Sequence, residues 1–322
     1  MSGKRPGGSP THEAVTQRIV DALEAGVAPW VKPWTTPHPQ EGVVRPRRIT
    51  GAAYSGINTI ILWMEALSRG YRASTWMSFR QAALLGGHVR KGEKGCSIVY
   101  YGQGAAEPDD AGQARPYRFL KTYTVFNVEQ VEGLDMEPGR PAAPTGCDEA
   151  RAFFGSCPAT IRHDAEGAWY STLDDEIRMP SACAFRDAES YYATLGHEMV
   201  HWTGAPSRLD RRFGRVAWGD EGYAREELVA ELGSAFLAAD LGLYLEPRDD
   251  HAAYISAWLA ILGGDSRAIF SAAAHAERAV RYLKDLQPKG AQDPATPCQT
   301  SSDHRHGRCL PTGHGWLRRM AA

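Results

Sequence analysis

The spacing of apolar positions predicts an alternation of helices and strands along the chain. Val15, Ile19 and Leu23 recur about once per turn after Thr11, so they predict an amphipathic helix that ends near Gly26. The same spacing predicts helices over 54–67, 78–85, 147–154, 191–202, 224–239, 254–262 and 269–286. Runs of β-branched and aromatic residues predict strands over 97–101, 118–126, 160–162, 169–173 and 176–180. This mixture of elements predicts an α+β fold.

Composition predicts two domains joined by a linker. Residues 1–10 are rich in Gly, Ser and Pro, which predicts a disordered start, and a small α+β domain is expected over 11–131. Pro138, Pro141 and Pro144 mark a linker over 132–146. A second domain is expected over 147–287, and residues 288–322 are expected to form a flexible tail.

Two histidines lie four residues apart in the helix expected over 191–202. Residues at this spacing differ by about 40° around a helix axis, so His197 and His201 project from one face and can bind a single metal ion. Glu198 lies beside them as a candidate general base. Zinc lowers the pKa of a bound water to about 7, and a neighbouring carboxylate can accept its proton. The pattern therefore predicts a zinc hydrolase site whose chemistry is amide hydrolysis.

A catalytic zinc ion needs a third protein ligand, and a later acidic segment offers one. Glu227 and Glu231 share one side of a helix that is apolar on another side. We assign Glu227 as the third ligand of one zinc ion, and Glu231 to a contact with an imidazole N–H. Spacing does not exclude Glu226 as the ligand. The alternative is an ordinary core helix followed by a helix with surface glutamates.

Longer stretches around these residues resemble the zincin domain of ArdC-like antirestriction proteins. The stretches are YYATLGHEMVHWTG (191–204), SRLD (207–210) and EELVAELG (226–233). The family's single-stranded-DNA-binding domain is similar to PWVKPW (29–34), YSGIN (54–58), WMSFRQ (76–81) and VFNVEQ (125–130). The resemblance spans roughly residues 12 to 285, and it departs at Gly196, where the family often has Ala, and after Gln287.

The resemblance implies a plasmid- or mobile-element-borne protein that binds single-stranded DNA and protects incoming DNA from host restriction. It also implies a gluzincin-like ligand set, HExxH plus Glu, formed by His197, His201 and Glu227. In zincin-like proteins the strand before the metal helix is an edge that pairs with an extended substrate, so residues 177–179 are expected to bind a peptide.

Charge is distributed unevenly between the two halves, and this favours a nucleic-acid partner. Residues 1–130 hold 16 Lys and Arg against 10 Asp and Glu, whereas residues 131–322 hold 20 against 28. The basic half also contains 13 of the 31 aromatic residues. Binding of single strands requires cations along the phosphates and rings that stack on bases. The first half is therefore the expected DNA-binding domain.

Particular side chains can be assigned to this binding. Six cations in Pro- or Gly-containing segments are the expected phosphate contacts: Arg45, Arg47, Arg48, Arg90, Lys91 and Lys94. The rings expected to stack on bases are Trp30, Trp34, Tyr54, Trp76 and Phe79. Lys32, which lies between two of these tryptophans in the sequence, is a further expected DNA contact. For each ring, a position in the hydrophobic core is equally compatible with the sequence. The basic residues could likewise form a solvated face that binds no DNA. Gly92 is followed by Glu93, so this segment is not a nucleotide-binding P-loop.

Cysteine usage and hydropathy favour a cytoplasmic protein. The six cysteines form no C-x-x-C pair, and no apolar run reaches 18 residues, so we expect reduced thiols and no membrane segment. Five Cys and His residues near the C-terminus, at positions 298, 304, 306, 309 and 314, fit no zinc-finger spacing, and a flexible tail is the preferred interpretation.

Three functional hypotheses follow. The first is a zinc peptidase brought to single-stranded DNA, where it cuts a protein substrate that the sequence does not identify. The second is a DNA-binding shield in which zinc only stabilises the fold. The third is a peptidase whose first domain binds protein. Glu198 favours the first over the second, and the charge distribution disfavours the third. Tyr223 and Arg208 are alternatives for the donor that stabilises a tetrahedral oxyanion.

Overall fold

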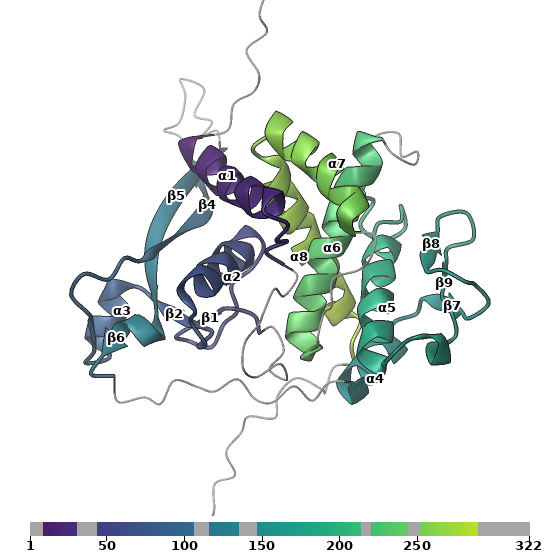
Figure 1. Cartoon of the computed structure of the whole chain (residues 1–322), viewed down its shortest axis with the longest axis horizontal. Coiled ribbons are helices and arrows are strands. Elements are labelled where there is room, and N and C mark those ends of the chain that lie inside the picture. Colours follow the sequence, from purple (N-terminus) through teal and green to yellow (C-terminus); the bar gives the residue numbers. More distant parts are fainter. Residues whose placement is uncertain are drawn as a thin grey trace, which may run out of the picture. The chain divides into compact units, whose positions relative to one another are not determined.

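The predicted mixture of helices and sheets is confirmed in the computed structural model (Figure 1). The structure describes residues 9–30, 44–105, 116–134, 147–213, 220–243 and 251–288. Its elements follow the predicted order, and most of them begin and end within a few residues of the expected positions. The predicted linker from 135 onward and the predicted tail from 289 onward lie outside the described residues.

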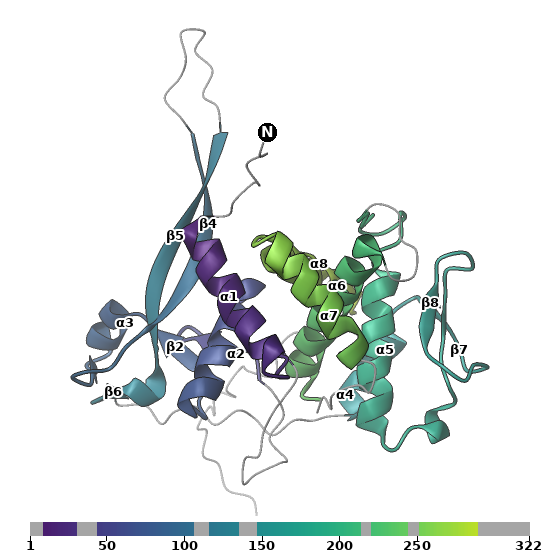
Figure 2. The ribbon, with the colours of Figure 1, turned by 45° about the horizontal axis from the view of Figure 1, so that its top comes forward.

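The first half combines helices with a long hairpin. Its elements are α1 (Pro10–Glu24), β1 (Arg47–Arg48), α2 (Ile57–Arg69), β2 (Thr75–Met77), α3 (Phe79–Leu84), β3 (His88–Val89), β4 (Cys96–Ala105), β5 (Pro116–Asn127), η1 (Val128–Gln130) and β6 (Val131–Glu132). One sheet has the order β1-β2-β5-β4, and a second sheet pairs β3 with β6. Strands β4 and β5 pair in antiparallel register from Cys96 opposite Val125 to Ala105 opposite Pro116. Figure 2 shows the outer end of this hairpin projecting beyond α1.

Local sequence explains where these helices begin and end. Ser78 caps α3 by accepting a hydrogen bond from the backbone N–H of Gln81, whose side chain returns to the Ser78 backbone. Helix α2 ends at Gly70, which adopts the left-handed conformation with φ 71° that glycine tolerates best.

The second half is a group of packed helices with a small sheet beside α5. Its elements are α4 (Cys147–Gly155), β7 (Thr160–Arg162), β8 (Trp169–Ser171), β9 (Glu176–Arg178), η2 (Ala182–Ala184), α5 (Ala188–Trp202), α6 (Glu221–Leu241), α7 (His251–Gly264) and α8 (Ala268–Asp285). Helix α6 lies between α5 and α8 in both views (Figures 1 and 2). All of its residues from 227 to 239 are buried, so the helix is enclosed around its whole circumference, and the side that carries Glu227 and Glu231 faces His197 of α5.

The prediction that residues 177–179 form an edge strand is wrong. The sheet order is β7-β9-β8, so the strand that precedes the metal helix, β9, is the central strand. Its backbone pairs in parallel with β7 and in antiparallel with β8. An extended peptide therefore has no free edge on β9. Within the described sheet, free edges belong to β7 and β8.

Side chains from both halves share one hydrophobic core. Trp30 of the first half meets Trp258 of α7 with ring centroids 5.8 Å apart, and Trp63 of α2 meets Phe236 of α6 at the same distance. The hydroxyl of Thr16 donates a hydrogen bond to the carbonyl of Ser266 at 2.7 Å. The two halves are thus packed together, while the domain boundaries expected from composition stay a prediction.

Two observations bear on the expected environment of the chain. No helix in the described ranges is long and apolar enough to cross a membrane. Cys96, Cys147, Cys157 and Cys183 carry free thiols. Cys298 and Cys309 lie outside the described residues, and so do the histidines of the same C-terminal segment.

Candidate metal centre

Two helices in close contact carry the predicted metal-binding residues. Helix α5 begins after Asp187, whose carboxylate accepts the backbone N–H of Ser190, and α6 begins after Asp220, which caps Tyr223 in the same way. A Cβ atom built on Gly233 of α6 would lie 2.7 Å from a methyl group of Val200 on α5. This glycine therefore permits the close approach of the two helices, which brings the first turns of α6 opposite the histidines of α5.

Three side chains converge at this contact. The Nε2 atoms of His197 and His201 are 3.2 Å apart, and the carboxylate oxygens of Glu227 lie 3.5 Å from each of them. Ligands about 2.0–2.1 Å from one tetrahedral ion are separated from one another by about 3.3 Å. The two 3.5 Å distances are to different oxygens of Glu227. One donor atom from each residue lies within 4.8 Å of the other two, so the three residues are close enough together to hold a single ion.

Each imidazole also has a carboxylate at its other nitrogen. Nδ1 of His201 lies 3.2 Å from Oε1 of Glu226, and Nδ1 of His197 lies 3.5 Å from Oε1 of Glu231. Such partners fix the orientation of a metal-binding ring and raise its basicity. The structure therefore separates the three glutamates by position: Glu227 faces both Nε2 atoms, while Glu226 and Glu231 face the Nδ1 atoms.

Arg211, which sequence reasoning missed, holds Glu226 in place, and Glu226 was considered there only as an alternative metal ligand. Its guanidinium donates to Glu226 at 2.6 and 3.1 Å, to the hydroxyl of Thr203 at 2.6 Å and to the carbonyl of Val200 at 2.5 Å. The side chain is 1% exposed. Arg211 thereby ties the end of α5 to the start of α6. Glu226 was visible beside Glu227 in the sequence, but no periodic pattern marks Arg211.

The surrounding carboxylates make the cluster attractive to cations. Burial alone would raise the pKa of Glu227, but contacts with His197 and His201 outweigh burial and lower this pKa to about 2. Burial alone would lower the pKa of His201, yet Glu226 and Glu227 raise it to about 9. Binding of a metal ion at Nε2 of His201 therefore competes with protonation of this imidazole.

The remaining predicted catalytic residues take different positions. Glu198 lies on α5 next to His197 and is 3% exposed. The hydroxyl of Tyr223 is 3.1 Å from the hydroxyl of Tyr254, and burial, followed by contacts with Tyr254 and Glu227, raises the pKa of Tyr223. Tyr223 is thus close to Glu227, the candidate third ligand.

Arg208 is engaged elsewhere. Its guanidinium forms an ion pair with Asp175 and donates to the hydroxyl of Tyr170 and the carbonyl of Trp202. Of the two oxyanion donors suggested by the sequence, only Tyr223 has a contact with a cluster residue among those described.

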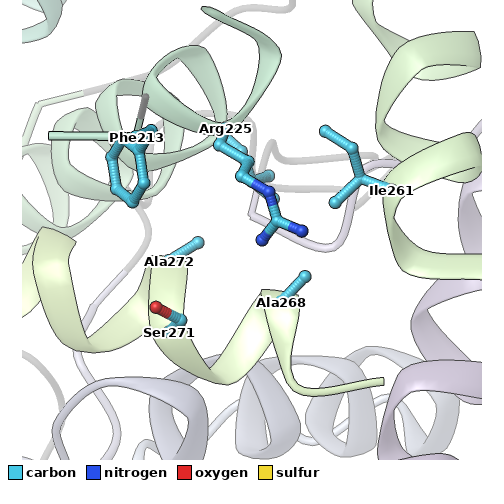
Figure 3. A pocket seen from close by; sticks show the side chains of 7 residues that line it. Phe213, Arg225, Ile261, Ala268, Ser271 and Ala272 are labelled. Carbon is cyan, nitrogen blue, oxygen red and sulfur yellow. The ribbon is translucent and has the colours of Figure 1, made fainter. Parts of the chain in front are cut away.

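A small cavity near α6 does not belong to the cluster (Figure 3). Its volume is about 10 Å³, enough for roughly one water molecule. The guanidinium of Arg225 and the side chain of Ile261 point into it between α6, α7 and α8. The residues that line it are Phe213, Arg225, Leu228, Ile261, Ala268, Ser271 and Ala272. His197, His201 and Glu227 are not among them, so the cavity is separate from the cluster.

Three rings among the predicted DNA contacts lie in the core, which is the alternative that the sequence left open for each of them. Trp30 and Trp76 are each 1% exposed, and Tyr54 is buried as well. A base can stack only on a ring face that solvent reaches, so none of these three can serve as a platform. Trp34 and Lys32 lie outside the described residues. Phe79 is 62% exposed and remains available.

Arg45 is also buried, contrary to the expectation that its Pro-containing segment would be exposed. Its guanidinium lies 2.9 Å from Glu277 and 3.3 Å from Asp240, and it packs 4.3 Å from the ring centroid of Phe236. These partners belong to α6 and α8, so Arg45 connects the two halves of the chain and cannot contact phosphates.

The other predicted phosphate contacts are at the surface. Arg47, Arg48, Lys91 and Lys94 are exposed. Arg90 is half-exposed, but it forms an ion pair with Glu93 at 2.7 Å and donates to the carbonyl of Glu129 at 2.6 Å. Arg90 therefore supports the turn before β4, while the two lysines of that turn point to solvent.

Comparison with known protein families finds a match in each half of the chain. Residues 9–126 match the N-terminal domain of the anti-restriction factor ArdC, and residues 148–275 match a zincin-like metallopeptidase. The uncharacterized protein y4eC of Sinorhizobium fredii is 38% identical over 303 residues, which cover 89% of this chain and 96% of that protein. A DNA primase TraC of Escherichia coli is 36% identical over 308 residues, and the aligned part spans 28% of its length.

Two crystal structures of the ArdC protein from plasmid R388 are similar to this chain. The metal-free structure has a TM-score of 0.75 and 42% identity, and it covers 86% of this chain and 98% of the R388 protein. The Mn(II)-bound structure has a TM-score of 0.73 and 41% identity, with 87% and 98% coverage.

Proposed function

The chain belongs to the ArdC antirestriction family, and from this premise we propose that it binds single-stranded DNA and hydrolyses a protein at that DNA. The proposed result is protection of incoming plasmid or mobile-element DNA from host restriction in the cytoplasm. The observation that carries the proposal is the cluster of His197, His201 and Glu227 with Glu198 beside it.

The donor set fits one divalent ion, and we assign zinc. Two imidazole nitrogens and a carboxylate oxygen, here within 4.8 Å of one another, are a common ligand set of catalytic zinc. A related protein crystallised with Mn(II) supports a divalent ion in this family. A bound ion would polarise the scissile carbonyl and make water a stronger nucleophile at neutral pH. Three protein ligands leave a fourth position for water or substrate.

Glu198 is the proposed general base. Its carboxylate would accept the proton of the attacking water and deliver it to the leaving amine, a role that typically contributes about 10²- to 10⁴-fold to the rate. A purely structural metal site would not use a base beside its ligands. Glu198 thus favours hydrolysis over a structural role for the ion.

Glu231, Glu226 and Tyr223 complete the proposed arrangement. The two carboxylates lie at the Nδ1 atoms of His201 and His197, and they would orient the rings so that each Nε2 can bind an ion. The hydroxyl of Tyr223, at the start of α6, would donate a hydrogen bond to the oxyanion that forms on the substrate carbonyl.

The single-stranded-DNA part of the proposal rests on the basic, aromatic first half and on the ArdC family match of that half. The alternative function is a DNA-binding shield in which the metal only stabilises the fold. TraC is a primase several times longer than this chain, and nothing of its primase activity is carried over.

A comparison of wild type with Glu198→Ala tests the proposal. Unmodified plasmid DNA is transferred into restricting and non-restricting cells, after both purified proteins have been shown to hold one zinc ion and to bind single strands equally. We expect the variant to lose protection in restricting cells only. Full protection by the variant would contradict hydrolysis and favour the shield.

A further inference from the structure

One face of the β4–β5 hairpin carries a continuous row of aromatic rings. In the pairing register Tyr100 lies opposite Lys121, Gly102 opposite Phe119, and Gly104 opposite Tyr117, so these residues share a face. The centroid of Tyr100 is 6.1 Å from that of Tyr123 and 6.4 Å from that of Phe119. Tyr117 follows at 6.0 Å from Phe119. We call this surface the aromatic ladder, and it consists of Tyr100, Tyr117, Phe119, Lys121 and Tyr123.

Two glycines make room for the ladder. A Cβ atom on Gly102 would lie 2.2 Å from the ring of Phe119, and one on Gly104 would lie 2.7 Å from the ring of Tyr117. Each ring therefore lies flat across the opposite strand, a known way to stabilise glycine in a sheet. Tyr100 and Tyr123 face no glycine, so stabilisation of glycine does not explain why aromatic residues occupy these two positions.

The tyrosines of the ladder are exposed to solvent. Their contacts differ from those of Tyr101, the residue that follows Tyr100 on β4. Tyr100, Tyr117 and Tyr123 are 52%, 52% and 51% exposed. Tyr101 is 53% exposed but lies on the opposite face, where its hydroxyl is 2.7 Å from His12 and its ring packs against Phe270. Tyr101 is thus attached to α1 and α8, whereas the ladder rings contact one another.

The charges around the ladder suit an anionic polymer. Neither β4 nor β5 contains an acidic residue. The ammonium group of Lys121 lies 4.9 Å from the centroid of Phe119, and exposed Lys91 and Lys94 immediately precede β4. The acidic residues of the connecting loop belong to 106–115, outside the described part of the chain.

We propose that the aromatic ladder is the surface on which successive bases of a single DNA strand stack, with Lys121 contacting the phosphates. The inference rests on the proposed single-stranded-DNA binding and names its site. Exposed ring faces in a row beside cations are what binding of single strands requires, because every base has a face that can stack. The buried Trp30, Tyr54 and Trp76 cannot supply this surface.

Fluorescence anisotropy with the full-length, zinc-loaded protein and labelled oligo(dT) of about 16 nucleotides tests the ladder. The variants are Tyr100→Ala, Tyr117→Ala and Tyr123→Ala. Tyr101→Ala is the matched control, with the same residue type, strand and exposure on the other face. Tyr100→Phe keeps the ring and removes the hydroxyl. A Tyr→Leu variant replaces any alanine variant whose circular dichroism spectrum departs from wild type.

We expect each ladder variant to bind oligo(dT) at least about fivefold more weakly, since one stacked base contributes about 1–3 kcal/mol. Tyr101→Ala and Tyr100→Phe should bind like wild type. Ladder variants that retain wild-type affinity would overturn the inference while leaving DNA binding intact. An equal loss in Tyr101→Ala, or an equal loss for a duplex of the same length, would also overturn it. Failure of wild type to bind oligo(dT) would remove both the ladder and the DNA part of the proposed function.

Discussion

The side chains of the candidate metal centre are buried, whereas the tyrosines of the aromatic ladder are exposed to solvent. His197, Glu198 and Glu227 are 3%, 3% and 6% exposed, whereas Tyr100 and Tyr123 are about half exposed. The cluster is fixed from both sides, by Gly233 at the helix contact and by Arg211 across the helix ends. The ladder rings are supported by one another and by glycines on the facing strand.

This difference follows from what each region has to do. Metal ligands must keep three donor atoms at fixed distances, and burial both locks the side chains and strengthens their electrostatic interactions. A stacking surface must let bases approach ring faces, so it has to remain open and is stabilised only along the hairpin. The two regions should therefore respond independently to mutation.

The largest expected effect is loss of the metal ion. His197→Ala or Glu227→Ala removes one of the three proposed ligands, so we expect the protein to retain no zinc after dialysis. Mass spectrometry of the metal content measures this loss. Affinity for oligo(dT) should stay within about twofold of wild type, since the ladder does not depend on the ion. Glu221→Ala, on the exposed start of α6, is the control and should retain the ion. A parallel loss of DNA binding would show that the two regions are not independent.

Arg45→Met tests whether a cation of the basic half belongs to the core. Its removal leaves Asp240 and Glu277 facing an uncharged side chain, which we expect to cost about 3–5 kcal/mol in the free energy of unfolding by urea. The control Arg47→Met, two residues away and exposed, should change stability by less than about 0.5 kcal/mol. Unchanged stability together with weaker DNA binding would instead make Arg45 a phosphate contact.

Glu226→Gln tests the support of the metal-binding imidazoles. The amide keeps the size of the side chain but weakens the contacts with His201 and Arg211. We expect zinc affinity to fall about 10- to 100-fold in competition with a chromophoric chelator. Glu221→Gln is the matched control on the same helix. Equal affinity of Glu226→Gln and wild type would mean that Arg211 and Glu226 serve the fold alone.

The smallest effects concern two helix glycines that differ in their surroundings. A Cβ on Gly196 would lie 3.5 Å from Phe154, an ordinary contact, so Gly196→Ala should stabilise the protein by about 0.5–1 kcal/mol. Gly233→Ala would push against Val200, and the cost of overpacking should leave a net loss of about 1 kcal/mol. Thermal unfolding of both variants measures the difference. A stabilising Gly233→Ala would show that the two helices have room to separate.

Local patterns predicted most elements and the histidine pair because their information lies within a few residues. His197 and His201 are neighbours on any helix, whatever packs around it. Glu227 required a further chemical argument, namely that a catalytic ion needs a third ligand. The structure brings this residue to the histidines, although only metal binding can establish its role.

Failures occurred where the answer depended on tertiary packing. Arg45 follows no pattern that predicts burial, and its partners lie 195 and 232 positions further along the chain, on α6 and α8. The central position of β9 depends on strand order, which the run of residues 176–178 does not encode. The ladder was likewise hidden, because its face is defined by the register between two strands rather than by either strand alone.

The most direct test of the metal centre is an anomalous difference map, recorded at the zinc edge, from crystals of the zinc-loaded protein. We predict one peak within bonding distance of Nε2 of His197, Nε2 of His201 and the carboxylate of Glu227, with Glu226 and Glu231 at the opposite nitrogens. A peak coordinated by Glu226 or Glu231 in place of Glu227, or no peak between α5 and α6, would contradict the account.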